Sequence, residues 1–288
     1  MTSSFLRSSM IPKLPLAMAC ALVCYAIHAA EPEPESPQVK FPDKKLEAAV
    51  RKFVFEKRDN DKPITEADMV NLSVIEAKSA GITNLAGLEK AVNLASLDLA
   101  KNQVADLKPL SGMARLQFLD LSDNRVEELG PLATNLALQY LELSNNKVRD
   151  VRALSGLTNM ASLYLSGNKL KDVAPLTQFP KIASLYLDRT GIRSIQGLGR
   201  LQTLFSLSLA SNNISDLSPL NGLNRISFLM LEHNKVKDLA PLVTMGQNDK
   251  EQRFAPFLQV YLKGNPLAAK TKREQLPVLE KIGMRIRN

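Results

Sequence analysis

Apolar residues recur along this chain with a period of 22 residues. The repeated pattern is L-x-x-L-x-L-x-x-N-x-Φ-x-x-L-x-x-L, in which Φ is an apolar residue. Full copies start at Leu94, Leu116, Leu138, Met160, Ile182, Leu204 and Ile226. A degenerate copy starts at Leu72 and a partial copy at Phe257, so the chain contains nine copies. A fixed period of this length predicts a solenoid in which each copy forms one turn.

Each copy divides into a strand, a turn and a returning arm. In the first full copy, Leu97 and Leu99 alternate with Ser96 and Asp98, which is the spacing of a strand with one buried side. Asparagine follows the strand, and its amide can bond backbone groups that a turn leaves unpaired. This position holds Asn102, Asn124, Asn146, Asn168, Asn212, Asn234 and Asn265. Thr190 replaces it in one copy, where a hydroxyl retains only part of that bonding.

Proline in the returning arm argues against a helical convex side, because proline lacks an N–H and has a fixed φ. The prolines are Pro109, Pro131, Pro175, Pro219 and Pro241. We expect an α/β solenoid, a right-handed leucine-rich-repeat arc. Its parallel sheet lines the concave side, and extended or 3-10 segments form the convex side. Stacked repeats bury one another's leucines, each contributing roughly 1.5–3 kcal/mol.

Both ends of the repeat array, residues 72–267, need a cap, because a bare terminal repeat exposes apolar surface and a strand edge. Residues 41–71 predict a helical N-terminal cap, with Asp43 as an N-cap and Thr65 at the start of a second helix. Residues 268–288 predict a C-terminal cap with one short helix. The period breaks once, and the polar insertion at about 245–254 predicts a surface excursion.

The first 30 residues resemble a secretory signal peptide. Residues 1–13 are polar and basic, and 14–30 are apolar apart from His28. We expect cleavage near Ala30, with cleavage after Ala26 as the alternative. Residues 31–40 form a Pro/Glu-rich linker. We expect an exported protein, whether periplasmic, held at the cell surface or secreted. An uncleaved N-terminal anchor is the alternative.

Both cysteines, Cys20 and Cys24, lie within the expected signal peptide. The mature chain should therefore contain no disulfide and no thiolate site. Lipidation at Cys20 is disfavoured, because the apolar run before it is very short. No later segment approaches the roughly 20 apolar residues that span a bilayer.

The outward positions of the strands form the candidate binding face. Four carboxylates occupy its N-terminal half: Glu76, Asp98, Asp120 and Glu142. Large side chains follow at Phe118, Tyr140, Tyr164, Tyr186, Phe228, Met230 and Tyr261. Every tyrosine after residue 30 lies on this face, and tyrosine combines a large contact area with a polar tip. We expect a protein- or peptide-binding face centred on Tyr140, Tyr164 and Tyr186. The alternative is that these rings only pack across the strands.

The net charge of +8 draws attention to the basic residues, which gather on the turn edge and on the C-terminal cap. A basic stripe on the turn edge lies beside an acidic column, which favours a solvated face over a polyanion site. The C-terminal cap is less balanced, with Lys263, Lys270, Lys272, Arg273, Lys281, Arg285 and Arg287. A second function is therefore open, in which this cap contacts anionic envelope material and the protein is a structural component of the envelope.

The sequence shows no arrangement of residues that is typical of a catalytic or cofactor site. His233 is the only histidine after residue 30, and with Glu232 alone it makes neither a triad nor a metal site. The concave carboxylates read as a uniform exposed row, whereas an acid/base pair needs two different environments. We therefore expect a non-enzymatic monomer without a cofactor, and export argues against nucleic acid.

Three segments resemble the N-terminal cap and first repeat of internalin-type leucine-rich-repeat proteins. They are Phe41-Pro-Asp-Lys-Lys-Leu-Glu-Ala-Ala-Val, Ile64-Thr-Glu-Ala-Asp-Met and Gly81-Ile-Thr-Asn-Leu-Ala-Gly-Leu. The resemblance covers roughly 41–267 and implies a bacterial, exported protein that grips other proteins with its concave face. The chain lacks the sorting motif and the immunoglobulin-like domain of surface-anchored members, so the expectation is protein binding in general rather than host adhesion.

Overall fold

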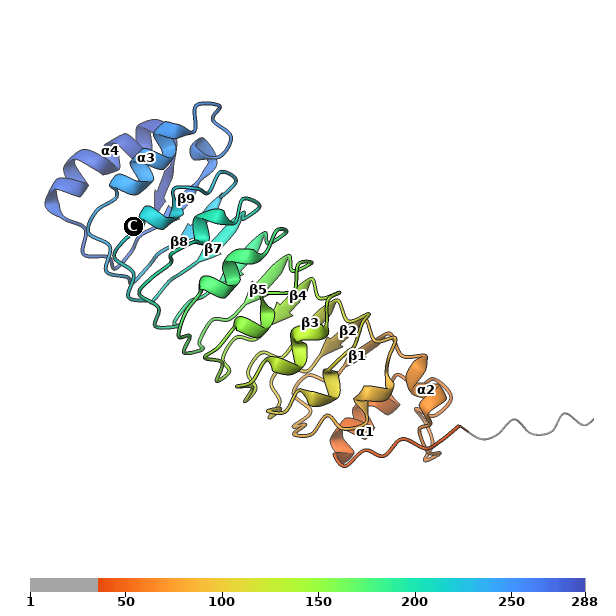
Figure 1. Ribbon diagram of the computed structural model, residues 1–288. Coiled ribbons are helices and arrows are strands. Elements are labelled where there is room, and N and C mark those ends of the chain that lie inside the picture. Colours follow the sequence, from red (N-terminus) through yellow and green to blue (C-terminus); the bar gives the residue numbers. More distant parts are fainter. Residues whose placement is uncertain (1–35, 288) are drawn as a thin grey trace, which may run out of the picture. The chain divides into compact units, whose positions relative to one another are not determined.

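Ten parallel strands follow one another in sequence order across a single sheet of residues 36–287, the part of the chain that the computed structural model describes (Figure 1). The strands are β1 Val74–Glu76, β2 Ser96–Asp98, β3 Phe118–Asp120, β4 Tyr140–Glu142, β5 Ser162–Tyr164, β6 Ser184–Tyr186, β7 Ser206–Ser208, β8 Phe228–Met230, β9 Gln259–Tyr261 and β10 Arg285–Arg287. The first nine come from the nine predicted copies. The solenoid and its parallel sheet are therefore confirmed.

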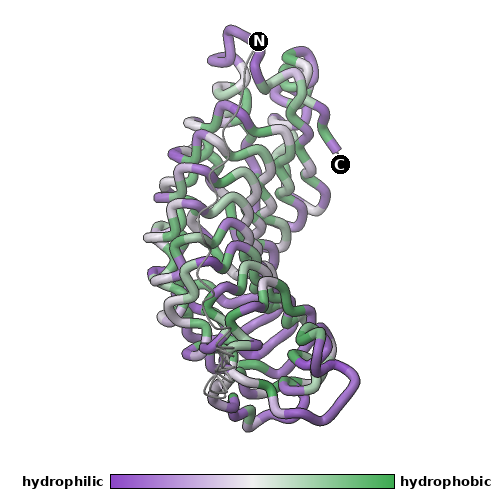
Figure 2. The backbone as a smooth tube through the Cα atoms, turned by 90° about the vertical axis from the view of Figure 1, so that its right-hand side faces the viewer, coloured by the Kyte–Doolittle hydropathy of each residue, from purple (hydrophilic) through white to green (hydrophobic). Residues whose placement is uncertain are grey.

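The 22-residue period fixes the register of the sheet. Leu97 pairs with Leu119, which in turn pairs with Leu141, so one repeat position forms one column across the strands. These central leucines are fully buried. Since side chains alternate along a strand, the third and fifth positions of each copy point outward and form the concave face. Apolar and polar stretches alternate accordingly along each turn of the tube (Figure 2).

Short 3-10 helices form most of the convex side, as the prolines predict. They are η1 Leu88–Lys90, η2 Lys108–Leu110, η3 Gly130–Thr134, η4 Arg152–Leu154, η5 Ala174–Gln178, η6 Leu198–Arg200, η7 Ser218–Leu220 and η8 Ala255–Phe257. The expectation that Pro241 excludes a regular helix is wrong. It lies in the first turn of α3 Ala240–Asn248, where a missing backbone N–H leaves no hydrogen bond unmade.

The turn asparagines connect consecutive repeats through the backbone. Asn168 is buried, and its Nδ2 donates to the carbonyl of Leu165 at 2.8 Å and to that of Leu143, one repeat earlier, at 2.9 Å. Its Oδ1 accepts from the N–H of Val148 at 2.9 Å. The predicted role of the asparagine is therefore confirmed, and one side chain satisfies buried groups of two repeats.

Thr190 retains only part of this bonding, as predicted. Its hydroxyl donates to the carbonyl of Leu187 at 2.8 Å, but no bond to the preceding repeat replaces that of asparagine. The next residue, Gly191, adopts a φ of 79°. The first copy, which has Ala80 in place of asparagine, turns in the same way at Gly81 with a φ of 73°. Both copies thus use glycine where asparagine is absent.

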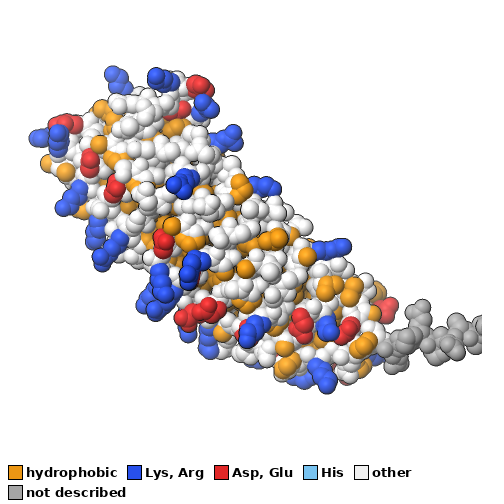
Figure 3. Space-filling view, viewed as in Figure 1, with side chains coloured by type: hydrophobic (Ala, Val, Ile, Leu, Met, Phe, Trp, Pro, Cys, Tyr) orange, Lys and Arg blue, Asp and Glu red, His pale blue; other side chains and the backbone are white. Residues whose placement is uncertain are grey.

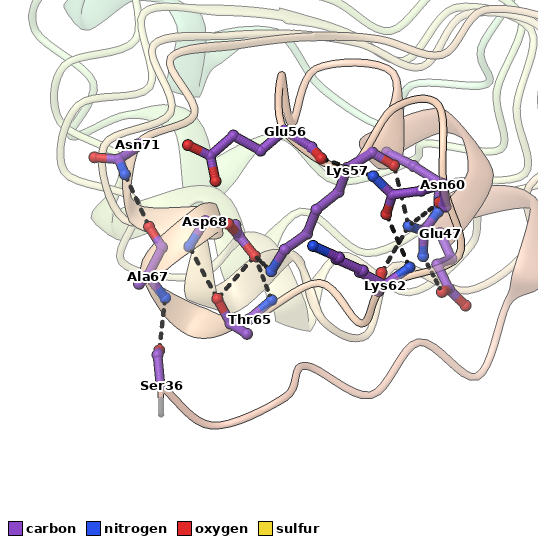
Figure 4. Close-up of polar contacts among 11 residues, drawn as sticks. Ser36, Glu47, Glu56, Lys57, Asn60, Lys62, Thr65, Ala67, Asp68 and Asn71 are labelled. Atoms are coloured by element: carbon purple, nitrogen blue, oxygen red, sulfur yellow. Dashed lines mark hydrogen bonds and ion pairs between the residues drawn. The ribbon is translucent and has the colours of Figure 1, made fainter. Parts of the chain in front are cut away.

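Two helices cover the first repeat, α1 Lys44–Arg51 and α2 Glu66–Val70. Asp43 caps α1, as predicted, and its Oδ2 also accepts from the backbone of Thr83 at 2.7 Å, which ties the cap to the first repeat. Thr65 caps α2 together with Asp68. Figure 4 shows the ion pair of Lys57 with Asp68 beside this capping box.

The C-terminal cap differs in two ways from the prediction. The insertion is only partly a surface excursion, because Met245 and Gly246 belong to α3 and are buried against the cap. The predicted short helix is α4 Leu276–Ile282, preceded by a π-turn at Thr271–Gln275 and ended by Gly283, with a φ of 102°. After Gly283 the chain adds a tenth strand, β10, which pairs with β9 and was not predicted.

The expected signal peptide and most of the linker lie outside the described residues. Within residues 36–287, no helix is both long and apolar enough to cross a membrane.

Replacing Asn168 with alanine should lower the free energy of unfolding by about 2 kcal/mol, because the buried N–H of Val148 loses its partner and the carbonyls of Leu143 and Leu165 each lose one of their two bonds. Urea titration followed by circular dichroism measures the change. The control is Asn213→Ala, at the exposed position that follows a turn asparagine. Equal effects of the two substitutions would show that the asparagine ladder does not stabilise the stack.

Acid should loosen the N-terminal cap through Asp43. Partial burial raises the pKa of this carboxyl, but hydrogen bonds from Thr83, Asn84 and Lys45 outweigh burial and lower it to about 2. Because the folded pKa lies below the ordinary 3.8, this stabilisation is complete above about pH 4 and disappears as the pH falls toward 2.

Hydrogen exchange of the Thr83 amide, measured between about pH 4 and 2, should report this loss. Asp43→Asn should make exchange fast at every pH in the window. Asp61→Asn, at an exposed aspartate, should leave the profile unchanged. A Thr83 amide that stays protected at the acid end in the unsubstituted protein would contradict the role of Asp43.

Candidate binding face

The register of the sheet places the predicted residues in two columns of the concave face. Pairing runs from Glu76 through Asp98 and Asp120 to Glu142, so the four carboxylates are consecutive neighbours, about 4.8 Å apart along the sheet. This fifth-position column continues through Tyr164, Tyr186, Ser208, Met230 and Tyr261. The third-position column includes Phe118, Tyr140 and Phe228.

The acidic row is not the uniform exposed set that the sequence predicted. Glu76 is exposed, whereas the other three carboxylates are half-buried. Each of those three accepts a hydrogen bond from the backbone N–H two residues further on and so closes the turn after its strand. The donors are Ala100 at 2.8 Å, Ser122 at 2.8 Å and Ser144 at 2.7 Å. Three of the four carboxylates therefore have a structural role in the turns.

Glu142 differs most from the rest of the row. Burial raises its pKa above the ordinary value, bonds from Ser144 partly offset this effect, and the charge of Asp120 adds to it. The neighbouring Tyr140 responds in the same direction. Burial and the charge of Glu142 raise the pKa of its phenol to about 12. The physical cause is the place where the acidic row meets the first tyrosine, because Tyr140 and Glu142 are both half-buried there and lie close to one another.

Four aromatic rings form a continuous ladder across strands β3 to β6. The ring centroids of Phe118 and Tyr140 lie 4.4 Å apart and stack at 12°. Tyr140 and Tyr164 are 5.3 Å apart, and Tyr164 and Tyr186 are 4.9 Å apart. The ladder steps from the third column to the fifth between β4 and β5, so it crosses the face diagonally. The structure thus brings together the three tyrosines on which the prediction is centred, and adds Phe118.

The C-terminal half of the face is less polar and partly closed. Ser206 and Ser208 are buried, although their positions point outward. Asp188 covers this region and accepts from the Ser208 hydroxyl and from the Ala210 N–H at 2.8 Å. Asp188 thereby replaces the carboxylate that the strand of Ser208 lacks. Sequence reasoning missed it because it lies two positions beyond the acidic column.

Phe228, Met230 and Tyr261 lie apart from the aromatic ladder. Phe228 packs against Phe205 with ring centroids 5.5 Å apart in an edge-on arrangement. Tyr261 and Met230 are neighbours in the fifth column, on strands β9 and β8. The predicted residues therefore divide into an acidic row, an aromatic ladder and a separate C-terminal group.

Strand β10 adds two cations to the face. Arg285 pairs with Gln259 and Arg287 with Tyr261, so both side chains extend the two columns at the C-terminal end. Both residues are exposed. The face is therefore acidic at β1–β4 and basic at β10. Sequence reasoning placed these arginines only in a basic cap, because Arg-Ile-Arg continues neither the leucine pattern nor the 22-residue period.

The turn edge matches the solvated surface that the sequence favours. Lys and Arg side chains gather along one long edge of the repeats in the view of Figure 3. In the acidic column beside the turns, Asp106, Asp150, Asp172, Asp216 and Asp238 each accept from the backbone N–H two residues on. Each carboxylate of this column thus accepts from the first N–H of the helix that follows it on the convex side.

The sole histidine after residue 30 and the possible metal ligands are spread over the described part of the chain. His233 is exposed, as expected, and its φ of 56° places it in the turn after β8. Among residues 36–287, no group of three or more His, Cys, Asp or Glu side chains is arranged to hold a metal ion.

Comparisons with known proteins agree with this architecture. The family model described as "Leucine Rich repeats (2 copies)" matches residues 92–134, 114–157 and 136–178. The crystal structure of internalin C2 (inlC2) from Listeria monocytogenes is 28% identical, with a TM-score of 0.70 over 80% of this chain and 100% of that chain. An internalin (inlF) from the same species is 24% identical, with a TM-score of 0.73 over 86% of this chain and 71% of that chain, and supports the fold.

A comparison with curated proteins found no significant match. The repeats and the parallel sheet define a leucine-rich-repeat protein. With its helical cap and its similarity to solved internalins, the chain resembles bacterial leucine-rich-repeat proteins of the internalin type.

The junction of acidic row and ladder can be tested by titration. Glu142→Gln should lower the pKa of Tyr140 from about 12, because removing the nearby charge makes the phenolate easier to form. The ¹³C shift of the tyrosine ring carbon that bears oxygen reports ionisation. Glu128→Gln, at an exposed glutamate outside this face, is the matched control. If the pKa of Tyr140 is the same in Glu142→Gln as in the unsubstituted protein, the charge of Glu142 does not act on Tyr140.

Proposed function

We propose that this protein is a non-enzymatic recognition protein that binds a protein or peptide partner through the concave face. The observation that carries the proposal is the aromatic ladder from Phe118 to Tyr186, which occupies the outward side of four neighbouring strands. Internalin-type proteins are interaction scaffolds. The leucines that define the repeat are buried in the core. The outward residues are free to differ from protein to protein.

The rings in the ladder are fixed before any partner arrives. Each ring packs on its neighbour, and the Tyr186 hydroxyl lies 3.1 Å from that of Ser206. A ring that is already ordered loses little conformational entropy on binding, so its contact area contributes more to affinity. Packing across strands and binding a partner are therefore compatible functions of the same residues.

The charges at the two ends give the face a direction. The acidic row at β1–β4 favours basic groups of a partner, and Arg285 and Arg287 favour acidic ones. We further propose that the protein acts outside the cytoplasm after removal of residues 1–30. The apolar run with a basic N-terminal flank supports export.

The proposal is tested with a triple substitution of Tyr140, Tyr164 and Tyr186 to alanine. Immobilised protein is incubated with envelope and culture extracts, and retained partners are compared with those of the unsubstituted chain. We expect loss of a specific partner, because removing an anchor of this kind costs about 2 kcal/mol or more per residue. Circular dichroism establishes that the variant folds.

A matched control replaces three exposed apolar residues that lie off the face, Val92, Leu136 and Phe257. The control variant should retain the partner. If the tyrosine variant retains every partner that the unsubstituted chain retains, the concave face is not the recognition surface.

A second candidate function is a structural role in which the C-terminal cap contacts anionic envelope material. The position of Arg285 and Arg287 on the free edge of the sheet favours it. In that case Arg285→Glu with Arg287→Glu should abolish salt-sensitive binding to vesicles that contain anionic lipid. The triple tyrosine variant should bind such vesicles normally. The reverse pattern would contradict this second function.

A further inference from the structure

A groove opens beside the concave face, where the insertion that breaks the 22-residue period meets the copies that start at Ile182, Leu204 and Ile226. It encloses about 530 Å³, and its lining includes Gln202, Phe205, Asn224, Arg225 and Arg253. Copies without an insertion have no counterpart of Arg253, because that residue belongs to the extra segment. The insertion therefore builds one side of the groove.

Two guanidinium groups give the groove its charge. Arg253 pairs through Nε with Glu251 at 2.9 Å, and no other ion pair occupies its terminal nitrogens in residues 36–287. Arg225 takes part in none of the ion pairs of that same region. Guanidinium groups bind planar anions such as carboxylates with two parallel hydrogen bonds. The lining thus offers donors for an anionic group.

The insertion is held in place by Asp249. Its Oδ1 accepts from the N–H of Arg253 at 3.0 Å, and its Oδ2 accepts from those of Phe254 at 3.0 Å and Ala255 at 2.9 Å. Phe254 and Ala255 are buried, so the segment is anchored in the core directly after Arg253. The backbone that carries Arg253 is therefore ordered without a ligand.

Amide groups fix the opposite side of the groove. Asn224 donates through Nδ2 to Oε1 of Gln202 at 2.6 Å, and Gln202 donates through Nε2 to the carbonyl of Gly222 at 2.7 Å. Gly199 and Gly222 lie in backbone contact here, and a Cβ on Gly222 would lie 2.3 Å from the Gly199 oxygen. These glycines let the copies that start at Ile182 and Leu204 approach closely, and they position the amides. Within the hydrogen bonds between Asn224, Gln202 and Gly222, the Asn224 amide uses its nitrogen and leaves its oxygen unused.

An exposed ring completes the groove. Phe205 is 48% exposed, although it is held edge-on against Phe228. Exposed phenylalanine beside two arginines suits a ligand that has an apolar group next to its anionic group. The side-chain oxygen of Asn224, whose Nδ2 donates to Gln202, can accept from the N–H of a peptide group. These features together match the last residue of a peptide, which combines a carboxylate, a peptide group and an apolar side chain.

We propose that this groove binds the C-terminal residue of a peptide, with the carboxylate on Arg225 and Arg253 and an apolar side chain on Phe205. The proposal does not depend on the function assigned to the concave face, because the groove lies beside that face and shares none of its tyrosines. It adds a site that recognises the end of a chain.

The first probe is N-acetyl-phenylalanine, compared with N-acetyl-phenylalanine amide, which lacks only the charge. Titrations at low ionic strength are followed by ¹H–¹⁵N spectra of the protein, including the arginine Nε signals. We expect saturable binding of the acid, with affinity at least about tenfold higher than that of the amide. Equal affinities, or no saturable binding of the acid, would overturn the proposal.

Variants then locate the site. Arg225→Gln and Arg253→Gln should each weaken acid binding about tenfold, and Phe205→Ala several-fold. The matched control is Arg115→Gln, because Arg115 occupies the same repeat position as Arg225 and is also exposed, but lies far from the insertion. It should bind like the unsubstituted protein. An equal loss in the control would assign the effect to net charge and contradict the groove.

Inorganic phosphate distinguishes a peptide end from a general anion site. Phosphate should bind more weakly than the acid, and its affinity should not depend on Phe205. If phosphate binds as tightly as N-acetyl-phenylalanine and Phe205→Ala affects neither, the groove is a simple anion site and the proposal is wrong. Thermal unfolding of each variant identifies any that fail to fold, and Arg225→Lys then replaces Arg225→Gln.

Discussion

The turn asparagine is the interaction on which the stack of repeats depends. A strand of three residues has few backbone hydrogen bonds of its own, so it needs neighbours on both sides. Asn168 shows how the turn supplies the connection, because its amide bonds the strand end of its own repeat and the backbone of the preceding one. Where asparagine is absent, as at Thr190, a glycine with positive φ follows it and the link to the preceding repeat is weaker. The 22-residue period is thus a requirement of hydrogen bonding as well as of packing.

The leucines of every repeat are buried in the core, so the repeats differ from one another mainly in their outward residues. The concave face carries carboxylates at one end, rings in the middle and arginines at the other end. The carboxylates also accept turn N–H groups, and the rings also stack on one another. Residues of this kind are ordered by the fold first, and this order prepares them for a partner.

The ends and the insertion show how a solenoid departs from its period. The N-terminal cap joins the first repeat through Asp43, and the C-terminal cap adds a strand to the sheet. Arginine at both outward positions of β10 leaves a charged edge, which discourages pairing with another chain. At the insertion, three copies and a loop meet to form a groove of about 530 Å³ that is lined by two arginines, Arg225 and Arg253.

The sequence by itself determined the repeat, the direction of its side chains and therefore the members of the concave face. A strict period places the same position in the same column, so Glu76, Asp98, Asp120 and Glu142 had to be neighbours. It could not give the contacts that depend on side-chain length and on breaks in the period. The diagonal step from Tyr140 to Tyr164, the cover of Asp188 over Ser208, the helix at Pro241 and the strand at Arg285–Arg287 are of this kind. Each depends on the side chains and backbone of the neighbouring repeat or cap. The pattern of residues along the chain does not contain that information.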